Sequence, residues 1–160
     1  MSNLKYIFFD IGCTLVDESD VWNKRCQEQS EMSEAKRRGI TAKDIYEEIV
    51  KASKEYKPQY RTVVKNLNFK ESATYRSELE KLYDDTDFVL DKLSKKYKLG
   101  IIANQGYGLK ERMKTLGILK YFDYIISSWD YKVMKPDVKL FEIALKESGS
   151  NRVLEECRFP

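Results

Sequence analysis

An uninterrupted apolar run near the start of the chain, Tyr6-Ile7-Phe8-Phe9, is followed directly by Asp10. A strand with one solvated face alternates apolar and polar residues, whereas a strand covered on both faces is apolar throughout. The run therefore predicts a short strand over residues 5–10 that is buried on both faces. A carboxylate at the end of such a strand, with Gly12 two positions later, is the feature that points to function.

Two later segments have the same character. The segment "KLGIIANQ", residues 98–105, predicts a second buried strand that ends at Ala103, and "FDYIISS", residues 122–128, predicts a third. Amphipathic helical patterns alternate with these strands, over residues 88–97, 109–117 and 137–147. Strands that alternate with helices are typical of a parallel α/β sheet.

Residues 17–83, between the first two strands, have a different pattern. Apolar residues such as Ile49 and Tyr56 recur at helical spacing among many charged residues. Thr41, with Asp44 three positions later, has the spacing of a capping box at the start of a helix. The segment is therefore predicted to be an all-helical block inserted into the α/β pattern.

Composition narrows the classes of function. The chain has 160 residues, with 29 Lys and Arg against 26 Asp and Glu, and this small net charge of +3 argues against a nucleic-acid partner. No apolar run is long enough for a signal core or a membrane span. The odd cysteine count lacks metal or redox spacing and suits a reducing compartment, the cysteines being Cys13, Cys26 and Cys157. We expect a soluble cytoplasmic protein without a membrane partner.

The chain contains no histidine. Its absence excludes Ser-His-Asp and Cys-His nucleophilic systems, and it excludes histidine metal ligands. Any chemistry must therefore come from carboxylates, lysines, hydroxyl groups and backbone amides.

In a parallel sheet, ligands bind beyond the carboxyl ends of the strands. Three loops should meet there, containing Asp10, Asn104 with the following glutamine, and Lys135. Asp10 can attack phosphorus as a carboxylate nucleophile, and Lys135 can neutralise the phosphoryl oxygens. Asn104 can donate hydrogen bonds to the same group, as can backbone amides of the loop that includes Cys13 and Thr14. Chemistry on such an anion usually requires Mg²⁺, held by carboxylate and carbonyl oxygens.

Four segments in order along the chain resemble the haloacid dehalogenase (HAD) superfamily, namely "FFDIGCTL", "LGIIANQ", "YFDYIISS" and "KVMKPDVKLFEIAL". The resemblance is to the branch with a helical cap inserted after the first motif. It implies a Rossmann-like core over residues 1–16 and 84–160, and an α-helical cap over residues 17–83. It also implies Mg²⁺ and hydrolysis of a small phosphorylated metabolite.

The resemblance assigns roles residue by residue. Asp10 matches the family nucleophile and metal ligand, and Lys135 matches the lysine of the third motif. Gly12 stands where family phosphatases have an acid/base aspartate, so it keeps the main-chain carbonyl that binds Mg²⁺ but lacks the acid. Ala103 stands where a Ser or Thr hydroxyl contacts phosphate, and Asn104 follows as in many relatives.

Gly12 and the C-terminal segment depart from the family pattern. Loss of a general acid typically costs about 10²–10⁴ in rate. The segment "NRVLEECRFP" contains Glu155 and Glu156, but no apolar strand leads into an acidic loop, and we do not assign these residues to the fourth motif. We therefore expect weak or absent turnover. The alternative is a non-catalytic binding or interaction protein built on the same scaffold.

A sheet that stops after its third strand would leave one edge of the first strand unpaired, which is a hazard for association. Three explanations are open. The chain is a truncated or frameshifted copy of a longer protein, or the first strand pairs with a second copy to form a homodimer, or residues 150–160 fold back over the edge. The unpaired edge predicts self-association through the first strand.

Overall fold

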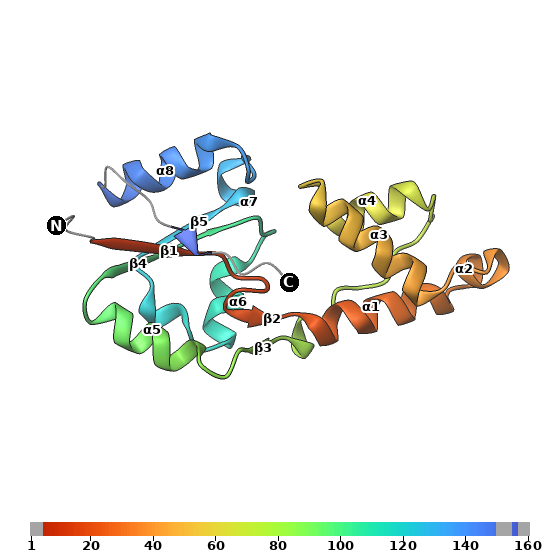
Figure 1. Ribbon diagram of the computed structural model, residues 1–160, viewed down its shortest axis with the longest axis horizontal. Coiled ribbons are helices and arrows are strands. Elements are labelled where there is room, and N and C mark those ends of the chain that lie inside the picture. Colours follow the sequence, from red (N-terminus) through yellow and green to blue (C-terminus); the bar gives the residue numbers. More distant parts are fainter. Residues whose placement is uncertain (1–4, 150–154, 157–160) are drawn as a thin grey trace. The chain divides into compact units, whose positions relative to one another are not determined.

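The computed structural model of the chain describes residues 5–149 and 155–156 (Figure 1). The chain divides into two compact units. One unit, the core unit, comprises Met1–Asp17 with Lys81–Pro160, and the other, the helical unit, comprises Glu18–Glu80. Each unit is described separately below.

The core unit contains a four-stranded sheet in the order β5-β4-β1-β6, in which every neighbouring pair is parallel. Its strands are β1 (Tyr6–Phe9), β4 (Lys98–Ala103), β5 (Tyr124–Ser127) and β6 (Glu155–Glu156). The helices of the unit are α5 (Thr86–Ser94), α6 (Leu109–Thr115), α7 (Ser128–Tyr131) and α8 (Val138–Ser148), with a 3-10 turn at Leu119–Tyr121. The predicted α/β class with a parallel sheet is confirmed.

Helices cover both faces of this sheet, and this explains why β1 does not alternate apolar and polar residues. Phe8, with no exposed surface, belongs to a cluster with Leu140 of α8. Phe9 belongs to a second cluster with Leu90 of α5 and Met113 of α6. Figure 1 shows α8 on one side of the sheet and α5 and α6 on the other. Burial on both faces therefore fixes β1 in the middle of the unit.

The expectation that the edge of the first strand is unpaired is wrong at Phe8 and Phe9, and of the three explanations the structure agrees with the one in which the C-terminal segment folds back over this edge. The short strand β6 pairs with β1 in parallel, with Phe8 opposite Glu155 and Phe9 opposite Glu156. Sequence patterns missed β6 because two consecutive glutamates have low strand propensity. The backbone N–H and C=O groups of β1 can nevertheless pair with the backbone of any residue. Along Phe8 and Phe9 the edge of β1 is thus paired within the chain. A homodimer through the first strand stays a prediction, without support from an open edge at these two residues.

A small antiparallel ladder marks where the chain leaves and re-enters the core unit. Strand β2 (Val16–Asp17) pairs with β3 (Lys81–Leu82). The Thr86 hydroxyl group and the Tyr83 amide both donate to the Leu15 carbonyl, at 3.0 and 3.2 Å. These bonds join the first residues after the insert to the loop that follows β1.

The helical unit consists of four α-helices and one 3-10 turn, namely α1 (Ser19–Glu31), α2 (Ser33–Arg38), α3 (Ala42–Lys54), α4 (Gln59–Asn66) and the turn Ser77–Leu79. The capping box predicted at Thr41 and Asp44 is present at the start of α3. Ile49 is buried as its spacing predicts. Tyr56 is 67% exposed instead, because α3 ends at Lys54 and Tyr56 has a left-handed backbone with φ of 54°.

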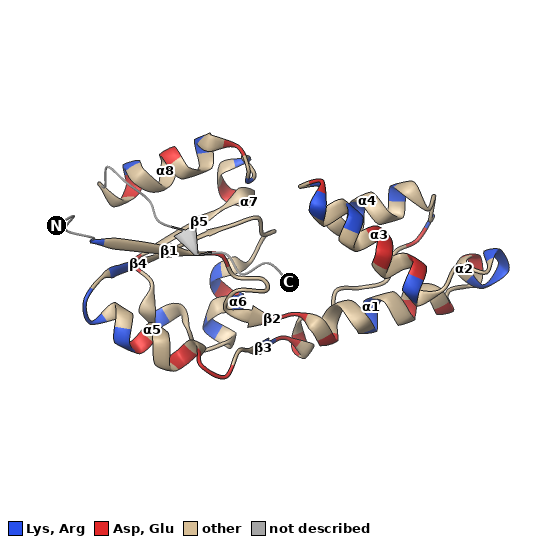
Figure 2. Ribbon diagram, viewed as in Figure 1, with Lys and Arg blue, Asp and Glu red and all other residues tan. Residues whose placement is uncertain are grey.

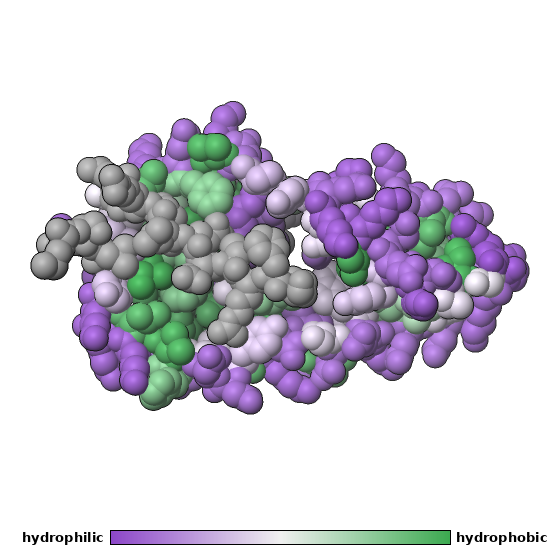
Figure 3. Space-filling model, viewed as in Figure 1, coloured by the Kyte–Doolittle hydropathy of each residue, from purple (hydrophilic) through white to green (hydrophobic). Residues whose placement is uncertain are grey.

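Acidic and basic residues are interspersed along the helices of this unit (Figure 2). Hydrophilic residues also cover most of its surface in the view of Figure 3. Surfaces of mixed charge are typical of solvated helices. None of the helices in residues 5–149 is long and apolar enough to cross a membrane.

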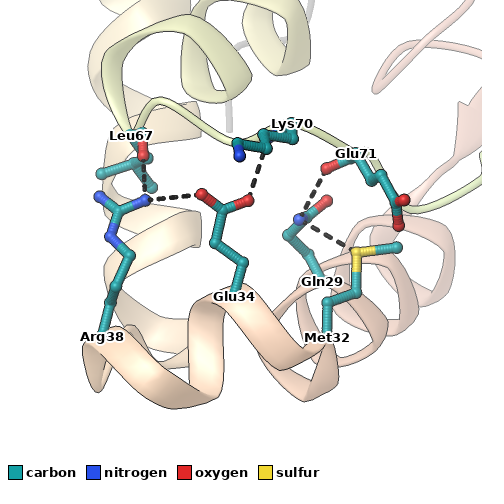
Figure 4. A network of polar contacts seen from close by, with 7 residues as sticks. All are labelled: Gln29, Met32, Glu34, Arg38, Leu67, Lys70 and Glu71. Carbon is teal, nitrogen blue, oxygen red and sulfur yellow. Dashed lines mark hydrogen bonds and ion pairs between the residues drawn. The ribbon is translucent and has the colours of Figure 1, made fainter.

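A buried amide holds the interior of the helical unit together. Gln29 of α1 is 1% exposed, and its Oε1 accepts hydrogen bonds from the Tyr60 hydroxyl group at 2.7 Å and the Ala73 amide at 2.8 Å. Its Nε2 donates to the Glu71 carbonyl at 3.1 Å and contacts Met32 Sδ (Figure 4). One side chain thereby satisfies polar groups from α4 and from the following loop.

A guanidinium group lies among aromatic rings in the same unit. Arg25 lies 3.4 Å above the centroid of the Tyr60 ring and donates from Nε to the Ala73 carbonyl at 2.9 Å. Burial lowers the pKa of Arg25 below its ordinary value, and burial raises the pKa of Tyr60 to about 12. The contact between the guanidinium group and the ring joins α1 to α4.

We expect Gly100→Ala to destabilise the core unit by about 1–3 kcal/mol, because overpacking a tight core has a cost of this size. A Cβ atom at Gly100 would overlap the ring of Phe8, which is fully buried and has no room to move. Gly106→Ala is the matched control, because a Cβ atom there meets nothing within 4 Å. Urea denaturation followed by circular dichroism measures both variants, and equal midpoints would contradict this account.

Gln29→Ala should destabilise the helical unit by about 2–4 kcal/mol, because it leaves several buried polar groups without partners. Gln27→Ala, on the exposed side of the same helix, should change the free energy of unfolding by less than about 0.5 kcal/mol. Thermal denaturation distinguishes the two variants. A similar loss in both variants would contradict a specific role of the buried amide, because alanine is a better helix former than glutamine and propensity alone would not destabilise either variant.

Candidate active site

The candidate site lies along the edge of the core sheet that is formed by the carboxyl ends of its strands. Asp10 directly follows β1, Asn104 directly follows β4, and Lys135 lies in the segment between α7 and α8 that follows β5. Because β1, β4 and β5 are parallel, their carboxyl ends share this edge. The fold thus brings together residues that are far apart in the sequence.

Asp10 and Lys135 form an ion pair. Lys135 Nζ lies 2.9 Å from Asp10 Oδ2 and donates a second hydrogen bond to the Ile102 carbonyl at 3.0 Å. The Ile11 amide donates to the other carboxylate oxygen, Asp10 Oδ1, at 2.8 Å. The two side chains are only 26% and 15% exposed. In such a partly buried pair, loss of either partner leaves the other charge uncompensated, so the contact holds both groups at the site.

Asn104 fixes the backbone of Lys135. Its Oδ1 accepts a hydrogen bond from the Lys135 amide at 2.7 Å, and its Nδ2 donates to the Lys135 carbonyl at 3.0 Å. Both polar ends of this side chain are thus bonded to one residue. A role of the Asn104 side chain in binding phosphate stays a prediction, and in this arrangement its direct contact is to Lys135.

The loop after Asp10 is a closed turn. The Thr14 amide donates to the Ile11 carbonyl at 3.2 Å, and the Cys13 amide donates to the Val16 carbonyl at 2.9 Å. Cys13 has a φ of 57°, in the left-handed region that favours glycine. The amides of Cys13 and Thr14 are therefore used inside the loop, and the predicted binding of substrate by them requires an exchange of partners.

Ala103 and the following loop complete the surroundings. Ala103 is fully buried at the end of β4 and offers no hydroxyl group. The Gln105 carbonyl accepts a hydrogen bond from the Ser128 hydroxyl group at 3.2 Å, and Gln105 Oε1 accepts one from Arg112 at 2.7 Å. Sequence reasoning missed the roles of Ser128, Arg112 and the Ile102 carbonyl, because no local pattern marks a long-range contact to a main-chain oxygen.

The donors beside Asp10 suit a hard cation that keeps part of its water shell. A carboxylate from Asp10 and the main-chain carbonyl of Gly12 are oxygen ligands of the kind that Mg²⁺ prefers. In the part of the chain that the structure describes, no cluster of three or more Asp, Glu, Cys or His residues could hold a metal. Mg²⁺ often binds through one or two carboxylates plus substrate phosphate, so this sparse set fits the ion.

Residues 7–153 match the haloacid dehalogenase-like hydrolase family. The chain belongs to this family. The match covers β4, β5, all of β1 except its first residue, the helical unit and every residue of the candidate site, and it ends before β6. The suspected resemblance to the HAD superfamily is thereby confirmed.

Similar proteins include phosphatases. The chain is 38% identical to the glyceraldehyde 3-phosphate phosphatase of Methanothermobacter thermautotrophicus over 66 residues, which are 40% of this chain and 29% of that protein. The matched stretch is thus less than a third of that relative's length.

Two solved structures share the fold. A HAD phosphatase from Thermococcus onnurineus has a TM-score of 0.67 and 22% identity, over 95% of this chain and 76% of that one. The HAD-hydrolase YfnB from Bacillus subtilis, solved bound to magnesium, has a TM-score of 0.66 and 16% identity, over 95% of this chain and 77% of that one.

We expect Asn104→Ala to destabilise the core unit by about 1–2 kcal/mol, because it removes both hydrogen bonds to the Lys135 backbone. Asn66→Ala is the matched control, since the Asn66 amide makes one exposed hydrogen bond, to Glu48. That control should cost less than about 0.5 kcal/mol. Urea denaturation measures both variants, and an Asn104→Ala protein as stable as the control would show that the paired bonds do not hold Lys135.

Proposed function

We propose that this chain is a HAD-family hydrolase that acts on a small phosphorylated substrate, with Asp10 as nucleophile and slow turnover. The observation that carries the proposal is the 2.9 Å contact between the Asp10 carboxylate and the Lys135 ammonium group at the carboxyl edge of the sheet. When a nucleophile and a cation lie this close, the cation can bind the oxygens of a phosphoryl group while the nucleophile attacks its phosphorus atom. The similarity to a glyceraldehyde 3-phosphate phosphatase supports a small phosphorylated metabolite as substrate.

The proposed reaction has two displacements at phosphorus. An oxygen of Asp10 attacks phosphorus, the bond to the leaving oxygen breaks, and an aspartyl-phosphate forms. Water then attacks the same phosphorus, and the bond to Asp10 breaks to release phosphate. In the free protein the Lys135 ammonium group contacts Asp10 Oδ2. An incoming phosphoryl group would bind this ammonium group in place of Asp10, which leaves Oδ2 available for attack.

Mg²⁺ would be held by the Asp10 carboxylate and the Gly12 carbonyl. When bound, the ion supplies positive charge that lowers the repulsion between the carboxylate and the phosphoryl oxygens. Lys135 supplies further positive charge, and its bond to the Ile102 carbonyl keeps the ammonium group beside Asp10.

Two residues account for the slow turnover. Gly12 has no side chain that could protonate the leaving oxygen, and absent general acid catalysis typically costs about 10²–10⁴ in rate. Ala103 provides no hydroxyl group for the phosphoryl oxygens. The leaving oxygen would then take its proton from solvent.

A second candidate function is binding without catalysis, as an interaction protein or a sensor of a phosphorylated metabolite. It is favoured by the missing acid at Gly12 and by the closed loop in which the Cys13 and Thr14 amides already have partners. Such a protein would need the Asp10 and Lys135 pair for affinity and not for turnover.

The deciding experiment compares Mg²⁺-dependent phosphate release from para-nitrophenyl phosphate by the native chain and two variants. We expect slow release that EDTA abolishes, no release by Asp10→Asn, and at least a tenfold faster release by Gly12→Asp, because an acid is restored.

Two lysine variants serve as an internal control for this experiment. Lys135→Met should abolish release, whereas Lys139→Met, an exposed lysine in the first turn of α8, should leave the rate within twofold. Release that survives Asp10→Asn would overturn Asp10 as nucleophile. Inactivity of every variant with intact folding would favour the binding function.

A further inference from the structure

Two exposed aromatic rings contact each other in the core unit. Tyr107 is 88% exposed and Trp129 is 48% exposed, and their ring centroids lie 6.3 Å apart with an angle of 71° between the planes. Single exposed aromatic residues are common on protein surfaces. Two exposed rings in contact form a contiguous apolar surface, whose hydration is unfavourable and which often marks a binding site. The steep angle between the planes means that the two rings form a corner and not a stack, and most of the Tyr107 ring is open to solvent.

The pair lies at the same sheet edge as the candidate site. Tyr107 is in the loop that follows β4, three residues after Asn104, and Trp129 is in α7, directly after β5. The hydrogen bond from the Ser128 hydroxyl group to the Gln105 carbonyl ties these two segments together. The bonds between Asn104 and Lys135 tie the same loop to the proposed phosphate contact.

Other exposed groups near the pair fit a ligand that is both apolar and anionic. Lys132 Nζ lies 3.8 Å from the centroid of the Trp129 ring, so a cation accompanies the apolar surface. Met134 and Val138, on either side of Lys135 in the sequence, are 42% and 65% exposed. Exposed apolar side chains are thus concentrated in the segments that follow β4 and β5, and the second of these segments contains the lysine of the site.

We propose that Tyr107 and Trp129 form a platform that binds a planar ring in the leaving group of a phosphate monoester. The platform would hold the ring while Lys135 holds the phosphoryl group, so the substrate class is an aryl, arylmethyl or nucleoside-like monophosphate. The inference rests on the proposed function for the phosphate contact. A planar ring fits this corner better than a flexible aliphatic chain, because stacking on an aromatic face costs the ligand little conformational freedom.

Binding is tested with two matched phosphonates, which resist hydrolysis. Benzylphosphonate and n-butylphosphonate carry the same charged group and differ in the planar ring. Calorimetry with the native chain and Mg²⁺ should give about tenfold tighter binding of benzylphosphonate, which is within the range of stacking on one or two rings. Tyr107→Ala and Trp129→Ala should each remove most of that preference and leave binding of n-butylphosphonate unchanged.

Phe88→Ala is the matched control. Phe88 is 60% exposed on α5, and Lys92 Nζ lies 4.1 Å from its ring centroid, so it combines an exposed ring and a lysine as Trp129 and Lys132 do, outside the segments that follow β4 and β5. This variant should keep the preference for benzylphosphonate. Equal affinities for the two phosphonates in the native chain would overturn the proposal, as would a preference that survives both platform variants.

A kinetic comparison separates this inference from the proposed function. Benzyl phosphate and n-butyl phosphate both release a primary alcohol, so their chemical steps are similar. The platform predicts a KM about tenfold lower for benzyl phosphate, and Tyr107→Ala should raise that KM with kcat within twofold.

Turnover with equal KM values for the two substrates would overturn the platform and leave the proposed hydrolase function intact. Binding preference without any turnover would support the platform and contradict the hydrolase. A Tyr107→Ala change confined to self-association in light scattering would assign the rings to a protein contact and overturn the proposal.

Discussion

Burial of β1 on both faces is the constraint on which the rest of the core unit depends. With Phe8 facing α8 and Phe9 facing α5 and α6, the strand has no solvated face on which a charged side chain could lie. A carboxylate on this strand is therefore tolerated only where the strand ends. Asp10 occupies that position, and the parallel neighbour β4 delivers Asn104 to the same edge. The sheet thus determines the place of the chemistry before any catalytic group is considered.

The strands and the central pair of the site could be predicted because their signals are local or topological. Buried strands have apolar runs, and parallel strands bring Asp10 and Lys135 to one edge whatever the distance in sequence. The strand at Glu155 could be anticipated only as one of three explanations for the edge of β1, because consecutive glutamates have low strand propensity and it is the pairing with β1 that places them in the sheet. The hydrogen-bond partner of Asn104 could not be predicted either, because a side-chain amide can bind a phosphate or a neighbouring backbone through the same N–H and C=O groups.

The polar groups of the site are arranged as a closed resting state. Each carboxylate oxygen of Asp10 contacts a donor from within the chain, and the Cys13 and Thr14 amides donate to carbonyl groups of their own loop. A substrate anion has to compete for these donors, so part of its binding energy is used to open the contacts.

The antiparallel ladder of β2 and β3 has a consequence for how such chains diversify. The polypeptide leaves the core unit at Asp17 and re-enters it at Lys81, and these two residues are cross-strand partners. All of Glu18–Glu80 is therefore a cassette inserted at the tip of one hairpin, which a tight two-residue turn could close in its absence. Recombination at this single junction could exchange whole helical inserts among relatives and leave the parallel scaffold untouched.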